Sequence, residues 1–530
     1  MEQEKEQKKW NNVQDATEKG GALLTGANFR FSEGAEDANW SGPYSAVDSK
    51  RPLGDRTTIL DVADRDEMDD YLFPLQAIDS YFTRSDGHVL PFSTSLQEFP
   101  AKGTTEFGGT LYFEIGTVNC CDILLGLSLQ IQLGHWLPPH VLNKLLKKEW
   151  VYSDPSMSWS YANSLGTSII QRADFMLDDQ ILETIDGDFT NMASLLFADV
   201  NQQYGVGSDA YGRIPFTSLP TMSADIEIYP SIGIYPTSNG ILTCILPFSF
   251  QRTILRSGFP LTSCKQGTLR VAITLRPFSE CVRRLNGTRD SCNQTPLGLP
   301  FVFQETASPY LEHTIVASTL IPAFQDAKLV TYGAMIHGKL RKALLHTAYD
   351  RLFRQVSLFS FSEPMKYAST FGEKSISLQL PLEINHPIEE ILWVVRRKDV
   401  ATNNEWTNYS SVLQSEYNLQ YNPQNDLLMN AELQVNGETF VEGDARYFRR
   451  EIAAVHRGGI AAYTNFVYGY SFAKRPGSQD PSGWFNASRT TDVRLRIEVA
   501  AGHEFEVLVW TININWVRFE NGIANKVFTT

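Results

Sequence analysis

The sequence has few of the features that mark several common protein classes. Only six cysteines occur among 530 residues, too few for a disulfide scaffold, so we expect buried free thiols, including the adjacent Cys120 and Cys121. Residues 1–22 contain no apolar core, and no secretory signal is predicted. The longest apolar stretch, residues 121–137, is interrupted by polar side chains and is shorter than a membrane-spanning helix requires.

Charge is scarce, and its sign does not suit nucleic acid. Charged residues make up 20% of the chain and the formal net charge is −14. Because contacts with phosphate supply most of the affinity for nucleic acids, we expect no direct nucleic acid binding. Hydrophobic residues make up 42%, enough for a full core, so the composition argues against general disorder.

Motifs that carry catalysis are missing as well. The sequence has no GxxxxGK[ST] phosphate loop, no GxSxG nucleophile elbow and no HExxH zinc motif. His135 and His140 are separated by two prolines, and the acidic run 61–70 lacks the central glycine of a calcium loop. We therefore predict no enzyme, cofactor or metal site. His386 is expected to make a structural hydrogen bond. The remaining basic residues are interpreted as isolated surface or interface charges, with phosphate binding as the alternative: Arg283, Arg284, Arg396, Arg397 and Lys398.

What the sequence does contain is the alternation typical of strands. From about residue 75 onward, short runs of alternating apolar and polar residues are separated by Gly, Pro, Asn and Asp, which indicates an all-β protein. Helices are expected only over 140–150, 190–203 and 342–355. Residues 1–70 are polar and irregular, with widely spaced aromatic residues, and are interpreted as an arm that packs on a partner.

An internal repeat is the most informative pattern. The dipeptide Asp178-Asp179 of the first half matches Asn436-Gly437 of the second, and Asn-Gly is a strong signal for a two-residue hairpin turn. We therefore expect two copies of one β domain. The passages recur in the same order: 106–128 with 370–395, including Asp122–Leu124 with Glu390–Leu392; 173–182 with 431–440; and 249–275 with 471–499.

Passages in both halves also carry a family resemblance. Asn385-His386-Pro387 precedes an apolar strand that ends at Trp393-Val394-Val395, and residues 470–489 contain Tyr-Ser-Phe-Ala, Arg-Pro, Pro-Ser-Gly and Asn-Ala-Ser-Arg in order. With these passages the chain resembles the double jelly-roll major capsid proteins of nucleocytoplasmic large DNA viruses. Residues 1–70 and 286–312 depart from the family. Further matching passages are 161–189, 246–273, 329–356 and 406–410.

The resemblance and the repeat together imply a fold. We expect an all-β chain of two tandem eight-stranded antiparallel jelly rolls with a few short helices in loops. The expected parts are an N-terminal arm at 1–74, a first jelly roll at 75–285, a linker at 286–312 and a second jelly roll at 313–530.

The resemblance also implies a function. A major capsid protein would form trimeric, pseudo-hexameric capsomers that tile the icosahedral shell of a large double-stranded DNA virus. Its partners would be further copies of the chain, neighbouring capsomers, and minor capsid and penton proteins. The arm would contact minor capsid proteins or the inner viral membrane side. The expected location is the virion capsid, after assembly in the host cytoplasm.

Other functions stay open at this stage. A minor or virophage-type double jelly-roll capsid protein would share the fold. A carbohydrate-binding or carbohydrate-cleaving β-sandwich is a further alternative, although cleavage needs paired carboxylates in a groove and the ten Trp residues are spread over both halves. The mass in solution distinguishes a trimeric capsomer from a monomeric carbohydrate-binding protein.

Glycosylation sequons are the only candidate modification sites. Asn286 and Asn293 lie in a polar segment and are the better glycan acceptors. Asn408 and Asn486 lie within family motifs, where an asparagine more commonly makes a turn. A fifth sequon stands at Asn39.

Overall fold

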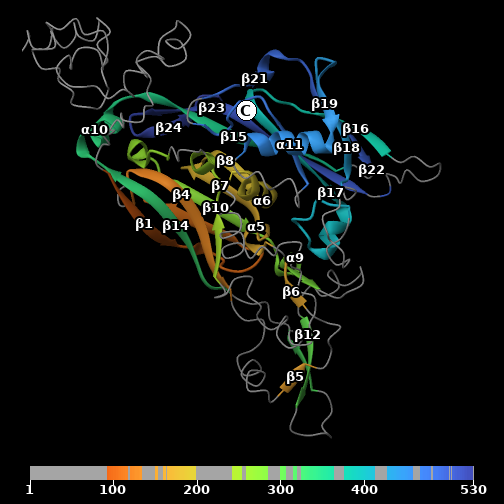
Figure 1. The fold of residues 1–530 in the computed structure, drawn as a ribbon. Coiled ribbons are helices and arrows are strands. Elements are labelled where there is room, and N and C mark those ends of the chain that lie inside the picture. Colours follow the sequence, from red (N-terminus) through yellow and green to blue (C-terminus); the bar gives the residue numbers. More distant parts are fainter. Residues whose placement is uncertain are drawn as a thin grey trace, which may run out of the picture. The chain divides into compact units, whose positions relative to one another are not determined.

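The computed structural model describes a largely β chain with short helices (Figure 1). None of the described helices is long and apolar enough to cross a membrane. The predicted arm lies outside the described residues. These are 92–116, 120–133, 150–152, 159–162, 164–197, 241–252, 258–284, 299–305, 314–318, 324–362, 375–411, 426–456, 466–478, 481–500, 502 and 504–528.

The first half forms two antiparallel sheets. Their apolar residues alternate along the strands; in β3, for example, Leu111, Phe113 and Ile115 are buried. One sheet has the order β1 (Phe92–Pro100), β14 (Phe324–Ile336), β4 (Ile123–Leu133) and β9 (Ile241–Ile245). The other has the order β2 (Lys102–Gly103), β3 (Thr110–Ile115), β10 (Leu269–Leu275), β7 (Ile170–Leu177) and β8 (Gln180–Asp186).

The second half repeats this arrangement. Strand β22 alternates in the same way, with Leu495, Ile497 and Val499 buried. One sheet has the order β15 (Tyr349–Phe361), β23 (Phe505–Glu520), β17 (Pro387–Arg397) and β20 (Val467–Ser471), with β21 (Phe485–Asn486) paired to β17 and β24 (Ile523–Lys526) to β23. The other has the order β16 (Ser375–Pro381), β22 (Val493–Ala500), β18 (Leu428–Val435) and β19 (Glu438–Asp444).

The predicted correspondence between the hairpins is confirmed. Asp178 and Asn436 each begin a two-residue turn, between β7 and β8 and between β18 and β19, and both have a φ of 52°. Each hairpin is followed by a helix, α6 (Gly187–Leu196) or α11 (Ala445–Val455). The side chains of Asp186 and Asp444 cap these helices by accepting from the third backbone N–H that follows. The main strands of the two halves therefore occur in equivalent order, while β2, β21 and β24 have no counterpart among the described strands.

Part of the predicted residue matching is wrong in register. Strand β4 bulges at Leu125, opposite Tyr332 and Gly333, and β17 bulges at Glu389, opposite Ile512 and Asn513. Superposing the bulges aligns Gly126, not Asp122, with Glu390. A bulge inserts one unpaired residue, and matching of letters alone does not detect it.

The pairing of strand β14 does not follow the domain boundary expected from the sequence. It lies within the range 313–530 that was expected to form the second roll, yet it pairs with β1 and β4 of the first. In the same position β23 pairs with β15 and β17 of the second. Residues 299–305 of the expected linker form β12, which pairs with β13 (Thr314–Ser318) and β5 (Trp150–Tyr152).

The helices also differ in part from expectation. The helix expected over 190–203 is observed as α6, which ends at Leu196. The helix expected over 342–355 is only partly correct, because α10 (Gly338–His346) ends before β15 begins at Tyr349. The remaining described helices are α5 (Leu165–Ser168), α8 (Ser249–Arg252), η4 (Leu261–Cys264), α9 (Phe278–Cys281), η5 (Lys398–Asn403) and η7 (Ala487–Arg489). Strand β11 (Val282–Arg284) directly follows α9 and pairs with β6 (Trp159–Tyr161) in a short separate sheet.

Candidate functional site

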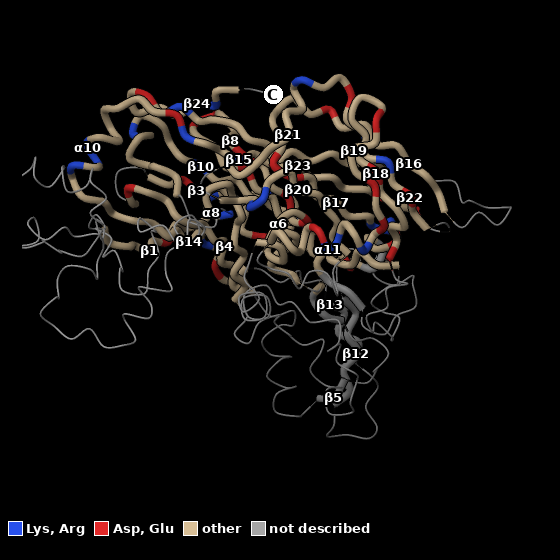
Figure 2. The backbone as a smooth tube through the Cα atoms, turned by 45° about the horizontal axis from the view of Figure 1, so that its top comes forward, with Lys and Arg blue, Asp and Glu red and all other residues tan. Residues whose placement is uncertain are grey.

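The most elaborate polar arrangement in the described chain joins the two rolls, and we call it the junction. Basic and acidic positions lie close together around α6, α8 and β23 (Figure 2). The first roll contributes one set of side chains and the second roll another. The junction is defined by Glu183, Asp186, Asp188 and Arg252 of the first roll and Arg354, Glu389, Arg396 and Trp510 of the second.

Two buried ion pairs form the centre of the junction. Arg252 Nη2 lies 2.7 Å from Glu183 Oε1, and Arg354 Nε lies 2.5 Å from Glu389 Oε2. Both pairs are almost completely shielded from solvent. Because an isolated charge is very costly to bury, each of these side chains depends on its partner.

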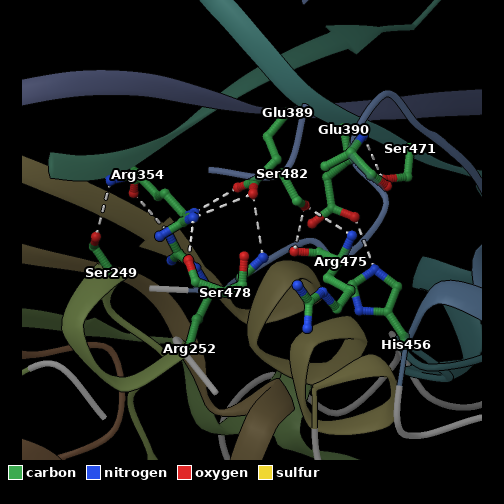
Figure 3. A network of polar contacts seen from close by, with 12 residues as sticks. Ser249, Arg252, Arg354, Glu389, Glu390, His456, Ser471, Arg475, Ser478 and Ser482 are labelled. Atoms are coloured by element: carbon green, nitrogen blue, oxygen red, sulfur yellow. Dashed lines mark hydrogen bonds and ion pairs between the residues drawn. The ribbon is translucent and has the colours of Figure 1, made fainter. Parts of the chain in front are cut away.

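Hydrogen bonds across the junction connect the two pairs. Arg252 Nη2 donates to the carbonyl of Arg354 over 2.7 Å, and the Arg354 backbone N–H donates to Ser249 Oγ over 3.0 Å. Arg354 also donates to the carbonyl of Ser478, and it lies between Ser249 and Ser478 in Figure 3. The first roll is thus held to β15 in one specific register.

A second group of contacts surrounds the beginning of α6. Trp510 Nε1 donates to Asp186 Oδ2 over 2.9 Å. Arg396 lies between two carboxylates, 2.8 Å from Asp188 and 2.7 Å from Glu506. Tyr409 donates its hydroxyl to Asp188. The two aspartates suit the positive end of the α6 helix dipole. Their carboxylates in turn bind a guanidinium and two hydrogen-bond donors of the second roll.

The family motif at 406–410 lies beside these contacts. Trp406 Nε1 donates to the carbonyl of Glu280, and the Arg276 guanidinium lies 3.9 Å from the Trp406 ring centroid. Asn404 Nδ2 donates to the carbonyl of Ser279. These three contacts run from the second roll to α9 and the residues just before it in the first roll. The motif is therefore part of the joint between the rolls.

The carboxylates of the junction hold neighbouring segments of the chain in place. Its carboxylates are engaged by arginine, by tryptophan or by backbone donors. Burial raises the pKa of Glu183 and of Glu389, and the neighbouring arginines oppose that rise. A buried ion pair adds little net stability compared with an apolar pair of the same size, but the hydrogen bonds between the rolls need one relative placement of their partners. The junction therefore sets how the two rolls are oriented.

A pH prediction follows from Asp186. Burial, with a smaller contribution from the charge of Asp188, raises the pKa of Asp186 to about 6, whereas an unfolded aspartate titrates near about 3.9. Between these values the folded chain binds the additional proton, so this group's contribution to stability falls as pH rises from about 4 to about 6. We expect the melting temperature of the wild type to exceed that of Asp186→Asn by more at pH 5 than at pH 7.5, a difference in stability of about 1.4 kcal/mol.

Asparagine is a suitable replacement because its carbonyl oxygen still caps α6. The matched control is Asp444→Asn, at the equivalent cap of α11. A wild-type advantage over Asp186→Asn that stays constant across this pH range would contradict the prediction.

Several sequence-predicted residues can be placed. Asn408 is buried and its Oδ1 accepts from Ser410, and Asn486 Oδ1 accepts from Ser488, so both make the turns that were expected. Arg396 was expected to be a surface or interface charge, and it is buried between Asp188 of the first roll and Glu506 of the second. Arg397 is also buried and pairs with Asp399.

For the other residues singled out in the sequence, one expectation is unmet, one is met and the rest lie outside the described residues. His386 is buried, but its Nε2 has no hydrogen-bond partner within the described part of the chain. The cysteines that the structure describes are buried and free, as expected: Cys120, Cys121, Cys244, Cys264 and Cys281. His135, His140, the acidic run 61–70 and the candidate glycan acceptors Asn286 and Asn293 lie outside the described residues.

The central residues of the junction were not identified from the sequence. The available signal was a charge at a strand position next to apolar residues: Glu183 follows Ile181 and Leu182 in β8, and Glu389 stands between Ile388 and Glu390 at the beginning of β17. Such charges are rarely buried unless they are paired. Their arginine partners come from distant segments, and the sequence pattern does not show which segments meet.

Comparison with known proteins relates the chain to viral capsids. Residues 363–525 match the family described as large eukaryotic DNA virus major capsid protein. A major capsid protein of Pyramimonas orientalis virus is 24% identical over 207 residues, covering 35% of this chain and 46% of that protein. The match thus spans less than half of the relative's length.

Solved structures share the fold. PBCV-1 VP54, fitted into a reconstruction of the virophage Sputnik, superposes with a TM-score of 0.60 at 15% identity, covering 85% of this chain and all of that one, 100%. The Faustovirus major capsid protein gives a TM-score of 0.55 at 10% identity, with 85% and 94% covered. These proteins are double jelly-roll capsid proteins. The double jelly-roll fold predicted from the sequence is therefore confirmed, while the count of eight strands in each roll stays a prediction.

Proposed function

We propose that this chain, a double jelly-roll protein of the kind found in the major capsid proteins of large eukaryotic DNA viruses, is the subunit from which the shell of such a virus is built. The observation that carries the proposal is the junction. It joins two rolls of equivalent strand order in a single orientation through buried contacts between the rolls, namely the Arg396–Asp188 ion pair and the hydrogen bonds of Arg252, Arg354 and Trp510. A subunit that tiles a shell needs this property, since its edges must repeat accurately.

The tile itself is a trimer in this proposal. Two similar rolls in each chain, taken three times, give a pseudo-hexagonal capsomer, and closed rings of identical chains are common assemblies. We place the first roll at about 92–336 and the second at about 349–526, because β14 pairs with the first roll. This division replaces the sequence-based boundary at residue 312.

Further partners belong to the same proposal. Neighbouring capsomers, minor capsid proteins and penton proteins would contact the outer edges of the trimer. The arm at 1–74 would face the inner viral membrane side. The net charge of −14 would discourage nonspecific contact with the packaged genome. The chain would reside in the virion capsid after assembly in the host cytoplasm.

The mass in solution tests the proposed trimer. We expect light scattering coupled to gel filtration to give about three times 59.7 kDa for the full-length chain. Obligate interfaces commonly bury more than about 2,000 Å², so the trimer should persist at micromolar concentration. A well-folded monomer at that concentration, particularly one that binds glycans, would favour the carbohydrate-binding alternative.

A further inference from the structure

Equivalent elements of the two rolls differ sharply in burial. The strands β8 and β19 follow the same turn and precede the same capped helix. The third residue of β8, Leu182, is 0% exposed, whereas the third residue of β19, Phe440, is 50% exposed. Helix α6 is buried along most of its length, but α11 has only four buried residues. One roll is covered at this face and the other is not.

The uncovered face of the second roll carries a group of contacting rings, which we call the aromatic patch. The Phe472 and Phe485 rings stack with centroids 5.1 Å apart, and Phe440 lies 5.7 Å from Phe472. Trp484, next in the chain to Phe485, is also exposed. The aromatic patch consists of Phe440, Tyr470, Phe472, Trp484 and Phe485.

The equivalent positions of the first roll are buried. Phe259 forms a β-bridge with β4 at the position where Phe485 pairs with β17. The Leu246 N–H donates a hydrogen bond to the carbonyl of Leu127, at the position where Tyr470 pairs with Ile391 in the second roll. Both Phe259 and Leu246 are almost completely shielded. The second roll contributes to this cover, because the Phe519 ring of β23 meets the Phe259 ring at 5.6 Å.

The surface of β15 and β23 that covers the first roll has its equivalent on β1 and β14, and that equivalent is exposed around Leu96. Val356 of β15 lies opposite Ile512 of β23, on the face that carries Trp510 toward Asp186, and it is only 7% exposed. The aligned bulges make Tyr332 of β14 the equivalent of Ile512. The residue opposite Tyr332 is Leu96 of β1, which is 64% exposed.

We propose that the aromatic patch of one chain packs against the outer face of β1 and β14 around Leu96 in a second copy of the chain. This contact would repeat the junction between chains. The occupant is a second copy because the two uncovered faces are the two halves of a joint that the chain already makes internally. The inference rests on the proposed capsid function and names the surfaces that the trimer uses.

The repeated joint differs from the junction in its chemistry. Glu183 of the junction is replaced at the equivalent position by Val441, and Glu389 by Leu125, the residue at the matching bulge. Arg354 is replaced by Thr94, two residues before Leu96. At these three positions the joint between chains is uncharged where the joint within a chain is ionic. Such a joint can be exposed in a free chain without leaving unpaired charges.

The contact is also directional. The patch and the β1 face are different surfaces, so copies associate head to tail and close into a ring. A chain with a damaged patch still offers an intact β1 face, and a chain with a damaged β1 face still offers an intact patch. This complementarity separates the proposed contact from one in which the same surface meets itself.

The test uses the full-length variants Phe440→Asp and Leu96→Asp. Each alone should remain monomeric, with association weakened about 100-fold or more, because a charge is buried at the centre of an apolar contact. Mixed in equal amounts, they should form a dimer of about twice 59.7 kDa and nothing larger, since only one intact joint is available. Tyr112→Asp, an exposed aromatic position on the other sheet of the first roll, is the matched control and should leave the trimer intact.

The outcomes separate this inference from the proposed function. If both variants remain trimers, the surfaces are wrong although the trimer stands; if the wild type is itself a monomer, the proposed trimer fails. Should the variants unfold, hydrogen exchange of the wild-type oligomer decides the question. Peptides covering 92–100 and 438–444 should gain protection relative to a diluted, dissociated sample, and unchanged exchange in both would overturn the inference.

Discussion

Replacing Arg354 with methionine is expected to lower the free energy of unfolding by about 3–5 kcal/mol, the range measured when one partner of a buried ion pair is removed. Glu389 would then remain buried, and its carboxylate would keep, within the described part of the chain, the weak hydrogen bond from the Gly477 N–H at 3.3 Å. The substitution also removes the donors to Ser478. Chemical denaturation followed by tryptophan fluorescence would measure the loss.

A double substitution identifies the cause of this loss. Arg354→Met combined with Glu389→Gln should recover a large part of the stability, because no uncompensated charge is left in the junction. Arg518→Met is the control: Arg518 pairs with Asp350 at the surface, and exposed pairs contribute at most about 1 kcal/mol. A double variant that is as unstable as Arg354→Met would show that the lost packing of the arginine, and not the stranded charge, is responsible.

Replacing Gly187 with alanine is expected to destabilise the first roll by about 3 kcal/mol, at the upper end of the range for overpacked sites. A Cβ at Gly187 would lie 2.2 Å from the carbonyl oxygen of Ile170 and 2.8 Å from that of Thr167. Both obstacles are backbone atoms, so a rotamer change cannot relieve the clash. Thermal denaturation of the purified variant would show the loss as a lower melting temperature.

The second roll supplies the control for this substitution. The equivalent first residue of α11 is Ala445, so the same local fold accepts a Cβ at this position in the second roll. Ala445→Gly should cost at most about 1 kcal/mol, the difference in helix propensity. A tolerated Gly187→Ala would mean that α6 can move away from the end of β7 without disturbing the junction.

The fold could be predicted from the sequence largely because its turns and strands carry local signals. Asp178 and Asn436 tolerate the positive φ that their turns require, so the two hairpins could be matched from sequence alone. Alternation identified the strands because each has one buried and one outward face. Neither signal depends on which strands are neighbours in space.

The junction depends on that missing information. Glu183 meets Arg252, and Arg354 meets Glu389, only after the strands are arranged in sheets. The pairing of β14 with β1 joins residues more than 200 positions apart, and alternation says which face of a strand is buried but not which strand lies next to it. The bulges at Leu125 and Glu389 each insert one unpaired residue into a strand, and the residue types at these positions do not reveal the bulge.

The covalent link between the rolls has a kinetic consequence for assembly. A joint within one chain forms at an effective concentration of roughly millimolar, whatever the amount of protein present. In a ring of six rolls built from three such chains, half of the joints are complete before any two molecules meet. Nucleation of the ring then depends on at most the third power of chain concentration, whereas six separate rolls would require up to the sixth. A tenfold fall in protein supply would slow the tethered design far less, so rings could begin to form early, while the chain is still dilute.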